Sequence, residues 1–174
     1  DRRPRPLRVA VLENETLKAL FLLDYGGRLW SLEHKPSGRE LLYRNPVIQP
    51  GNLAVRNAWL AGGVEWNCSV RGHTPLTCSP LFGARLRAAD GTPVLRLYEW
   101  ERIRQVPYQM DFWLPEGSPC LFARLRIHNP HDREIPMYWW SNIAVPEAGV
   151  RVLVPADGAY NFGYAGKFSR IPIP

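Results

Sequence analysis

Apolar and polar residues alternate with a period of two over much of the chain. In residues 121–128 one face of an extended chain holds Leu121, Ala123, Leu125 and Ile127, and the other holds Arg124, Arg126 and His128. Residues 108–114 repeat this pattern, and a turn-forming sequence at 115–119 separates the two segments. The pattern predicts two half-buried strands that pair as an antiparallel hairpin.

Similar segments recur along the chain, separated by turn signals rich in glycine, proline, asparagine and aspartate. No segment shows sustained apolar spacing at i, i+3, i+4 and i+7, and 17 prolines and 14 glycines interrupt every candidate for a long helix. The sequence therefore predicts an all-β fold, an antiparallel β-sandwich. The further predicted strands are residues 7–12, 17–23, 28–34, 40–43, 81–88, 94–103, 134–144 and 150–154.

The composition favours a soluble globular protein. Of the 174 residues, 45% are hydrophobic and 22% are charged, which is enough for one domain with a core. The longest uncharged apolar runs, such as residues 19–23, are far shorter than the roughly 20 residues that cross a bilayer, so we expect no membrane partner. Three cysteines without a disulfide pattern favour reduced thiols in a cytoplasmic protein.

The basic residues are concentrated in part at the N-terminus. The net charge of +6 comes from 22 basic and 16 acidic residues, and residues 1–8 hold four arginines and two prolines. This predicts a flexible basic arm at 1–6 followed by one domain at 7–174. The other basic residues are spread along predicted strands, so we expect no nucleic-acid partner. A start at Asp1 and the ending at 171–174 read as an excised portion of a longer chain.

Residues 62–75 hold the most concentrated set of candidate functional side chains. Glycines there allow close approach or positive φ, and Pro75 fixes the exit from the turn. The segment is interpreted as a defined loop that presents Glu65, Arg71 and His73 to a ligand. The alternative is a solvated loop between strands whose polar residues bind nothing.

Tryptophan is abundant in this chain and serves sugar sites as well as cores. Its ring face accepts the C–H groups of a pyranose, while arginine and carboxylate side chains bind sugar hydroxyls. Consecutive strand residues face opposite ways, so Trp139 and Trp140 cannot both line one cleft in a regular strand. The candidates are Trp30, Trp59, Trp66, Trp100, Trp113, Trp139 and Trp140.

Zinc-type ligands occur at Cys68, His73 and Cys78, but their spacing matches no standard zinc pattern and no fourth ligand is evident. We expect the two cysteines to be small buried side chains, and we expect no metal and no cofactor. His73 with Glu65 is the best acid–base pair for sugar chemistry, because it joins a group that titrates near neutrality to a carboxylate. The sequence contains no nucleophile elbow and no phosphate-binding glycine loop.

Three segments together carry a family resemblance: residues 24–32, 38–43 and 62–73. The first has a glycine turn and an arginine that lead into a strand, and the last looks like a histidine loop. They resemble the galactose mutarotase-like superfamily. The likeness is closest to an uncharacterised bacterial domain that often precedes tetratricopeptide repeats, on residues 71–75, 107–108 and 137–147.

The resemblance implies a β-supersandwich, of which this chain is a truncated part, with carbohydrate in a concave face. Catalytic members use a histidine acid and a late glutamate base, and His73 matches the earlier, sugar-binding histidine. Tyr138, Trp139 and Trp140 occupy the segment in which the catalytic histidine is expected. The glutamate would fall beyond Pro174.

Three hypotheses follow from the sequence. The first is a carbohydrate-binding, mutarotase-like domain of a larger repeat-containing protein, with sugar contacts from Arg28, Glu65, Trp66, Arg71 and His73. The second is an aldose 1-epimerase, an isomerase, in which His73 is the candidate catalytic residue and the base lies outside this chain. The third is a structural β-sandwich that binds protein partners. A sandwich cut in mid-sheet also predicts self-association through exposed sheet edges.

Overall fold

The computed structural model describes residues 3–51, 59–68, 72–162 and 166–173, and these contain twelve strands and one short 3-10 helix, η1 (Lys35–Ser37). No helix within these ranges is long and apolar enough to cross a membrane. The strands are β1 (Val9–Glu13), β2 (Leu17–Leu22), β3 (Arg28–His34), β4 (Arg39–Glu40), β5 (Val64–Cys68), β6 (Phe82–Arg87), β7 (Pro93–Glu101), β8 (Val106–Trp113), β9 (Phe122–Ile127), β10 (Trp139–Ile143), β11 (Gly158–Phe162) and β12 (Phe168–Pro172).

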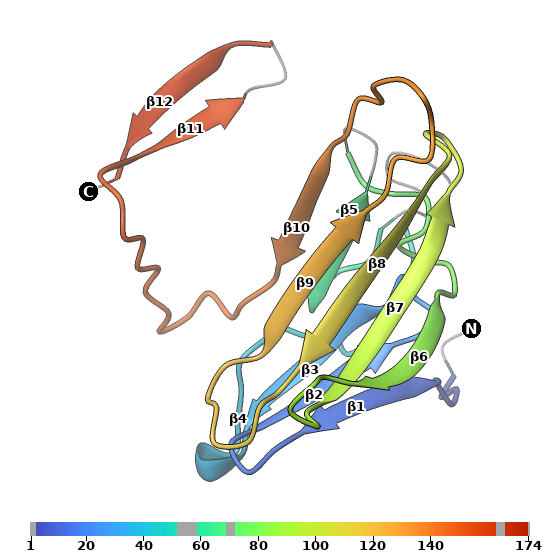
Figure 1. Ribbon diagram of the computed structural model, residues 1–174. Coiled ribbons are helices and arrows are strands. Elements are labelled where there is room, and N and C mark those ends of the chain that lie inside the picture. Colours follow the sequence, from blue (N-terminus) through green and yellow to red (C-terminus); the bar gives the residue numbers. More distant parts are fainter. Residues whose placement is uncertain (1–2, 52–58, 69–71, 163–165, 174) are drawn as a thin grey trace.

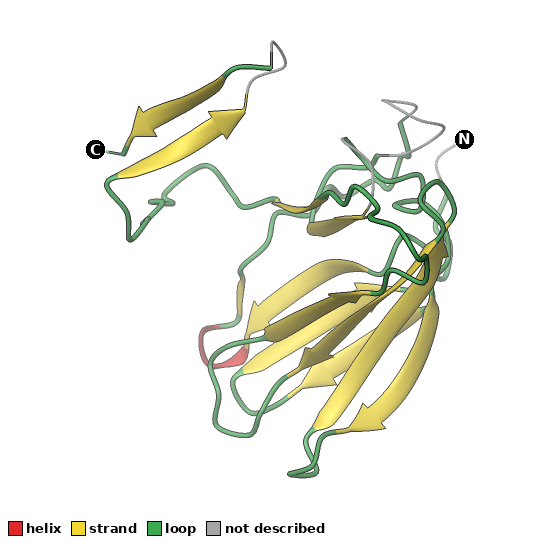
Figure 2. Cartoon of the chain, turned by 45° about the horizontal axis from the view of Figure 1, so that its top comes forward, coloured by secondary structure: helices red, strands yellow, loops and turns green. Residues whose placement is uncertain are grey.

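Two main sheets make up the body of the protein (Figure 1, Figure 2). The first has the order β1-β2-β3-β5-β10, with β4 paired to β3, and the second has the order β6-β7-β8-β9. The strand pairs in both sheets are antiparallel. The structure confirms the predicted all-β, antiparallel sandwich.

The apolar core lies between the two sheets. Side chains from β1, β2 and β3 meet side chains from β7 and β8, and the ring centroids of Phe21 and Phe112 lie 4.6 Å apart across the interface. Apolar surface removed from water stabilises the fold by about 25 cal/mol per Å². The buried members of the core are Leu12, Leu17, Ala19, Phe21, Leu29, Leu42, Val64, Cys68, Leu76, Leu81, Leu95, Leu97, Tyr108, Met110, Phe112 and Leu114.

The hairpin predicted from residues 108–128 is present. β8 and β9 pair from Tyr108 opposite Ile127 to Trp113 opposite Phe122. The alternate residues of β8 that begin with Tyr108 are buried, whereas the arginines of β9 are exposed. The period-two pattern therefore identified both strands and the buried face of β8, whereas the apolar face of β9 is only partly buried, at Leu125 and Ile127.

The interpretation of residues 62–75 as a loop is wrong in part, because Val64–Cys68 forms strand β5. β5 pairs with β10 along its whole length, and with β3 through a single residue pair among the described residues. Its two faces are both largely buried, one against the core and one beneath the following loop. The residues of β5 do alternate between apolar and polar, but the polar face that carries Glu65 and Asn67 is buried, whereas the polar face of a half-buried strand is exposed.

Three other strand predictions differ from the structure. Residues 134–144 are extended in a sheet only in β10, and residues 40–43 overlap β4 at one position. Residues 150–154 form no strand, and Val152 and Leu153 are 78% and 76% exposed. Apolar residues there have the propensity for a strand, but they pair with no sheet.

The sequence also misses the hairpin β11–β12. Its strands pair with each other and with no other strand among the described residues, and Figure 1 shows the hairpin standing apart from the sandwich. The rings of Tyr160 and Phe168 stack across the pair with centroids 5.1 Å apart. Because β12 is exposed along its length, it has no alternation of buried and exposed residues from which a strand could be predicted.

The three cysteines are free thiols. Cys68 is buried in the core, as predicted, whereas Cys78 is only partly buried and Cys120 is exposed. Burial raises the pKa of Cys68 to about 12. This thiol is therefore protonated and unreactive near neutral pH.

A glycine pair before β5 lets this strand approach β3 closely. Gly62 and Gly63 have φ values of +108° and +68°. A Cβ on Gly63 would lie 2.3 Å from the carbonyl oxygen of Leu29, so the backbone leaves no space for a side chain. The close approach brings Glu65 of β5 beside Arg28 of β3.

We expect Gly63→Ala to lower the free energy of unfolding by about 3 kcal/mol or more, from left-handed strain together with the backbone clash. Gly38→Ala is the matched control, because Gly38 has φ +62° and a Cβ there would meet nothing within 4 Å. The control should cost only about 1–2 kcal/mol. Urea unfolding of both variants gives the comparison, and equal losses would show that the contact with Leu29 has no energetic weight.

Candidate functional site

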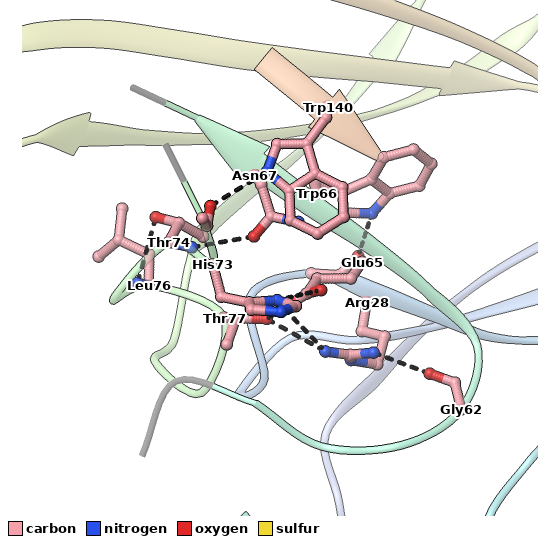
Figure 3. A network of polar contacts seen from close by, with 12 residues as sticks. Arg28, Gly62, Glu65, Trp66, Asn67, His73, Thr74, Leu76, Thr77 and Trp140 are labelled. Atoms are coloured by element: carbon pink, nitrogen blue, oxygen red, sulfur yellow. Dashed lines mark hydrogen bonds and ion pairs between the residues drawn. The ribbon is translucent and has the colours of Figure 1, made fainter. Parts of the chain in front are cut away.

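The candidate site lies on the face of β5 that is turned away from the core. Trp66 and Cys68 pack on the core side of the strand. Strand alternation puts Glu65 and Asn67 on the opposite face. The loop at residues 72–81 folds back over this face and contributes the remaining polar groups (Figure 3).

Glu65 is the centre of the polar network and is 1% exposed. Its Oε1 accepts a hydrogen bond of 2.7 Å from the Thr77 hydroxyl, and its Oε2 accepts one of 2.9 Å from Nδ1 of His73 (Figure 3). Nη2 of Arg28 forms an ion pair with Oε1 at 3.5 Å. A carboxylate withdrawn from water needs such partners, because a buried charge without them is strongly unfavourable.

Arg28 is 3% exposed and is fixed from three sides. Nη1 donates to the carbonyl oxygen of Gly62 at 2.8 Å, and Nη2 donates to the Thr77 hydroxyl at 3.1 Å. Burial lowers the pKa of Arg28, and the Glu65 carboxylate opposes that change, so the guanidinium stays protonated. Arg28 acts on the site through Thr77 and Glu65.

His73 is the member of the polar network that reaches the protein surface. A carboxylate only accepts hydrogen bonds, so Nδ1 carries the hydrogen that it donates to Glu65. Nε2 has no hydrogen-bond partner within the described parts of the chain, and the side chain is 17% exposed. Nε2 can therefore accept a hydrogen bond from a ligand when the ring is neutral and donate one when it is protonated.

Two indoles from the described residues lie beside the imidazole. The ring centroid of Trp140 is 5.1 Å from that of His73, and the centroid of Trp59 is 6.3 Å away, both in edge-on geometry. Nε1 of Trp140 donates to the carbonyl oxygen of Gly72 at 3.0 Å, which fixes the ring next to the loop (Figure 3). An oriented imidazole with half-buried aromatic rings beside it is suited to a ring-shaped polar ligand.

The loop over β5 is held at both of its ends. The backbone N–H of Thr74 donates to Oδ1 of Asn67 at 2.9 Å, and the N–H of Gly26 donates to the carbonyl oxygen of Ser79 at 2.8 Å. Gly26 has φ +64°, and a Cβ there would lie 2.8 Å from Cα of Thr77. The glycine turn before β3 thus lets the loop come close enough for Thr77 to reach the carboxylate.

Three of the predicted site residues come together in the structure: Arg28, Glu65 and His73. Trp66 does not join them. Its ring lies on the core side of β5, with its centroid 5.2 Å from that of Phe112, and its Nε1 donates to a backbone carbonyl. The aromatic part of the site comes from other residues.

Sequence reasoning missed four members of the site. Thr77 and Asn67 gave no signal, because single polar residues of these types are common in loops and strands. Trp59 and Trp140 belong to the seven candidate tryptophans, but the sequence does not single them out. Strand alternation places Trp139 and Trp140 on opposite faces without showing which of them lies beside His73. Arg71, the remaining predicted contact, lies outside the described residues.

The described residues contain no group of three or more histidine, cysteine, aspartate or glutamate side chains that could hold a metal ion. Cys68 lies in the core, whereas His73 lies on the other side of β5. The strand itself separates these two potential ligands.

The fold and the site define an all-β sandwich domain in which a buried charge network supports a partly exposed histidine. The chain belongs to the family described as a domain of unknown function (DUF5107), whose family model matches residues 2–162. It is also similar to the crystal structure of a TPR-domain containing protein from Parabacteroides distasonis ATCC 8503, with a TM-score of 0.79 and 28% sequence identity over 98% of this chain. The chain spans 29% of the length of that protein.

We expect Glu65→Gln to lower the free energy of unfolding by about 3–5 kcal/mol, because it leaves the buried Arg28 without a counter-charge and turns an acceptor into a donor. Glu13→Gln is the matched control. Glu13 pairs with Lys35 at the surface and is 42% exposed, so its loss should hardly change the unfolding midpoint. Chemical denaturation measures both, and similar midpoints for the two variants would contradict a structural role for the Glu65 charge.

Proposed function

We propose that this domain binds carbohydrate at the His73 site and is a mutarotase-like module of a larger, repeat-containing protein. The observation that carries the proposal is the buried Glu65 carboxylate, which holds His73 in one orientation beside two indoles. A sugar needs this combination, since its C–H faces stack on aromatic rings while its hydroxyls bind directed polar groups. The sequence resemblance to the galactose mutarotase-like superfamily points to the same ligand class.

Binding is proposed ahead of catalysis because of the side chains near His73. Opening and closing a sugar ring needs an acid and a base on the two sides of the reacting bond. His73 is the one histidine that the described residues bring to this site, and its carboxylate partner Glu65 is buried beneath it. Trp139 and Trp140 occupy the strand in which the resemblance implies a catalytic histidine. An aldose 1-epimerase with a base outside this chain is the alternative that the experiment below distinguishes.

The larger context of the proposal rests on the similar crystal structure. That protein is a TPR-domain containing protein, and this chain matches 29% of its length. We propose that the present domain serves as the ligand-binding part of a protein that also contains tetratricopeptide repeats. The three free thiols agree with a reducing, cytoplasmic setting for it.

The test is saturation-transfer proton NMR of the larger protein that is proposed to contain this domain, with a panel of aldoses and sugar phosphates, followed by titration of the best ligand. We expect saturation transfer to at least one sugar and about tenfold weaker binding for His73→Gln and Trp140→Ala. His34→Gln is the matched control, because His34 bonds Ser37 at the opposite end of β3 from Arg28, and it should bind as the parent does.

The same spectra report exchange between the α and β anomers. Accelerated exchange that is lost in His73→Gln would replace the binding module with an epimerase. Absence of both saturation transfer and accelerated exchange would contradict the carbohydrate proposal and favour a structural sandwich that binds protein partners.

A further inference from the structure

The outer face of the second sheet carries aromatic side chains that the core does not use. Phe82, Tyr98 and Trp100 are 59%, 41% and 44% exposed. Phe82 and Tyr98 lie opposite each other on β6 and β7, and their rings stack with centroids 5.5 Å apart. Soluble domains rarely leave several aromatic rings grouped on one exposed sheet face, and such groups commonly mark a binding surface.

These aromatic residues line a groove of about 630 Å³ across β6, β7, β8 and β9, which lie side by side in Figure 1. That volume falls within the range of small-ligand sites, roughly 300–1,000 Å³. Gln109, Arg126 and His128 form its polar side. The groove is built on four paired strands, so its side chains have a rigid support.

The charges of the groove are not balanced. Arg96 is neutralised by Asp111 through hydrogen bonds of 2.6 and 2.8 Å, and Gln109 donates to the same carboxylate at 3.2 Å. Arg126, which lies opposite Gln109 in the strand register, has no carboxylate partner among the described residues. The carboxylate of Glu99 does not face this surface, because Glu99 lies on the same side of β7 as the buried Leu97 and opposite the buried Tyr108 in the register. One guanidinium is thus left for an anionic ligand.

We propose that this groove is a second binding site, independent of His73, which takes an acidic oligosaccharide such as a uronate-containing chain. Pyranose faces stack on Tyr98 and Trp100, and the guanidinium of Arg126 binds a ring carboxylate through two parallel hydrogen bonds. The remaining acceptor atom of Gln109, Oε1, takes a sugar hydroxyl. The unpaired arginine beside the aromatic rings selects an acidic sugar over a neutral one.

Isothermal titration of the whole chain with a short oligogalacturonate tests the proposal. We expect saturable binding that weakens as salt is raised, and at least about tenfold weaker binding for Trp100→Ala and for Arg126→Ala. A neutral maltooligosaccharide of the same length should bind at least about tenfold more weakly than the acidic probe.

The matched controls are Tyr160→Ala, an exposed aromatic residue of the hairpin, and Arg87→Ala, an exposed arginine of β6 that does not line the groove. Both should bind the probe as the parent does, and thermal melting confirms that all variants are folded. His73→Gln should also retain binding, so failure of the His73 proposal leaves this one intact.

Four results would overturn the proposal. They are no saturable binding of oligogalacturonate, equal binding of the neutral probe, losses no larger in the groove variants than in the controls, and loss of binding in His73→Gln. Tighter binding of polyuridylate that is lost in the same groove variants would assign the groove to single-stranded nucleic acid instead.

Discussion

A carboxylate withdrawn from water must keep its oxygens engaged, and Glu65 does so with partners from distant parts of the sequence. Arg28 comes from β3, whereas Thr77 and His73 come from the loop after β5. These partners are in turn fixed, since Arg28 also bonds Thr77 and the carbonyl oxygen of Gly62. The interactions that compensate the buried Glu65 charge therefore also fix the orientation of His73. The candidate site and the stability of the first sheet depend on the same set of interactions.

The two faces of each sheet have different roles, because successive side chains of a strand point to opposite faces. Inward-facing residues of both sheets form one apolar core. The outward face of β5 carries the Glu65 network, while the outward face of the second sheet carries aromatic rings and arginines. Neighbouring residues such as Trp139 and Trp140 can thus belong to different environments, one packed on the core and the other beside His73.

The sequence predicts best those strands that have one solvent-exposed face and one buried face. β8 and β9 have this pattern, and their positions and pairing were predicted correctly. β5 also alternates between apolar and polar residues, but its polar face is buried, and the glycines directly before this short strand favoured the reading of the segment as a loop. In the site, glycines and a histidine drew attention to the right segment. The roles of Thr77 and Trp59 depend on the return of a loop across the sheet, which no local pattern encodes.

The pairing of β5 also gives the first sheet a mechanical weakness. One residue pair joins β5 to β3 among the described residues, Leu29 opposite Val64, whereas five pairs join it to β10. The two-stranded unit β5–β10 is thus joined to β3 by little backbone pairing, and the Arg28–Glu65 ion pair links the two sides of this junction. Local opening of a protein follows such lines of low backbone connectivity. A ligand bound at His73 would restrain the loop over β5 and so strengthen the junction between β5 and β3. Ligand binding would then slow amide hydrogen exchange along β10.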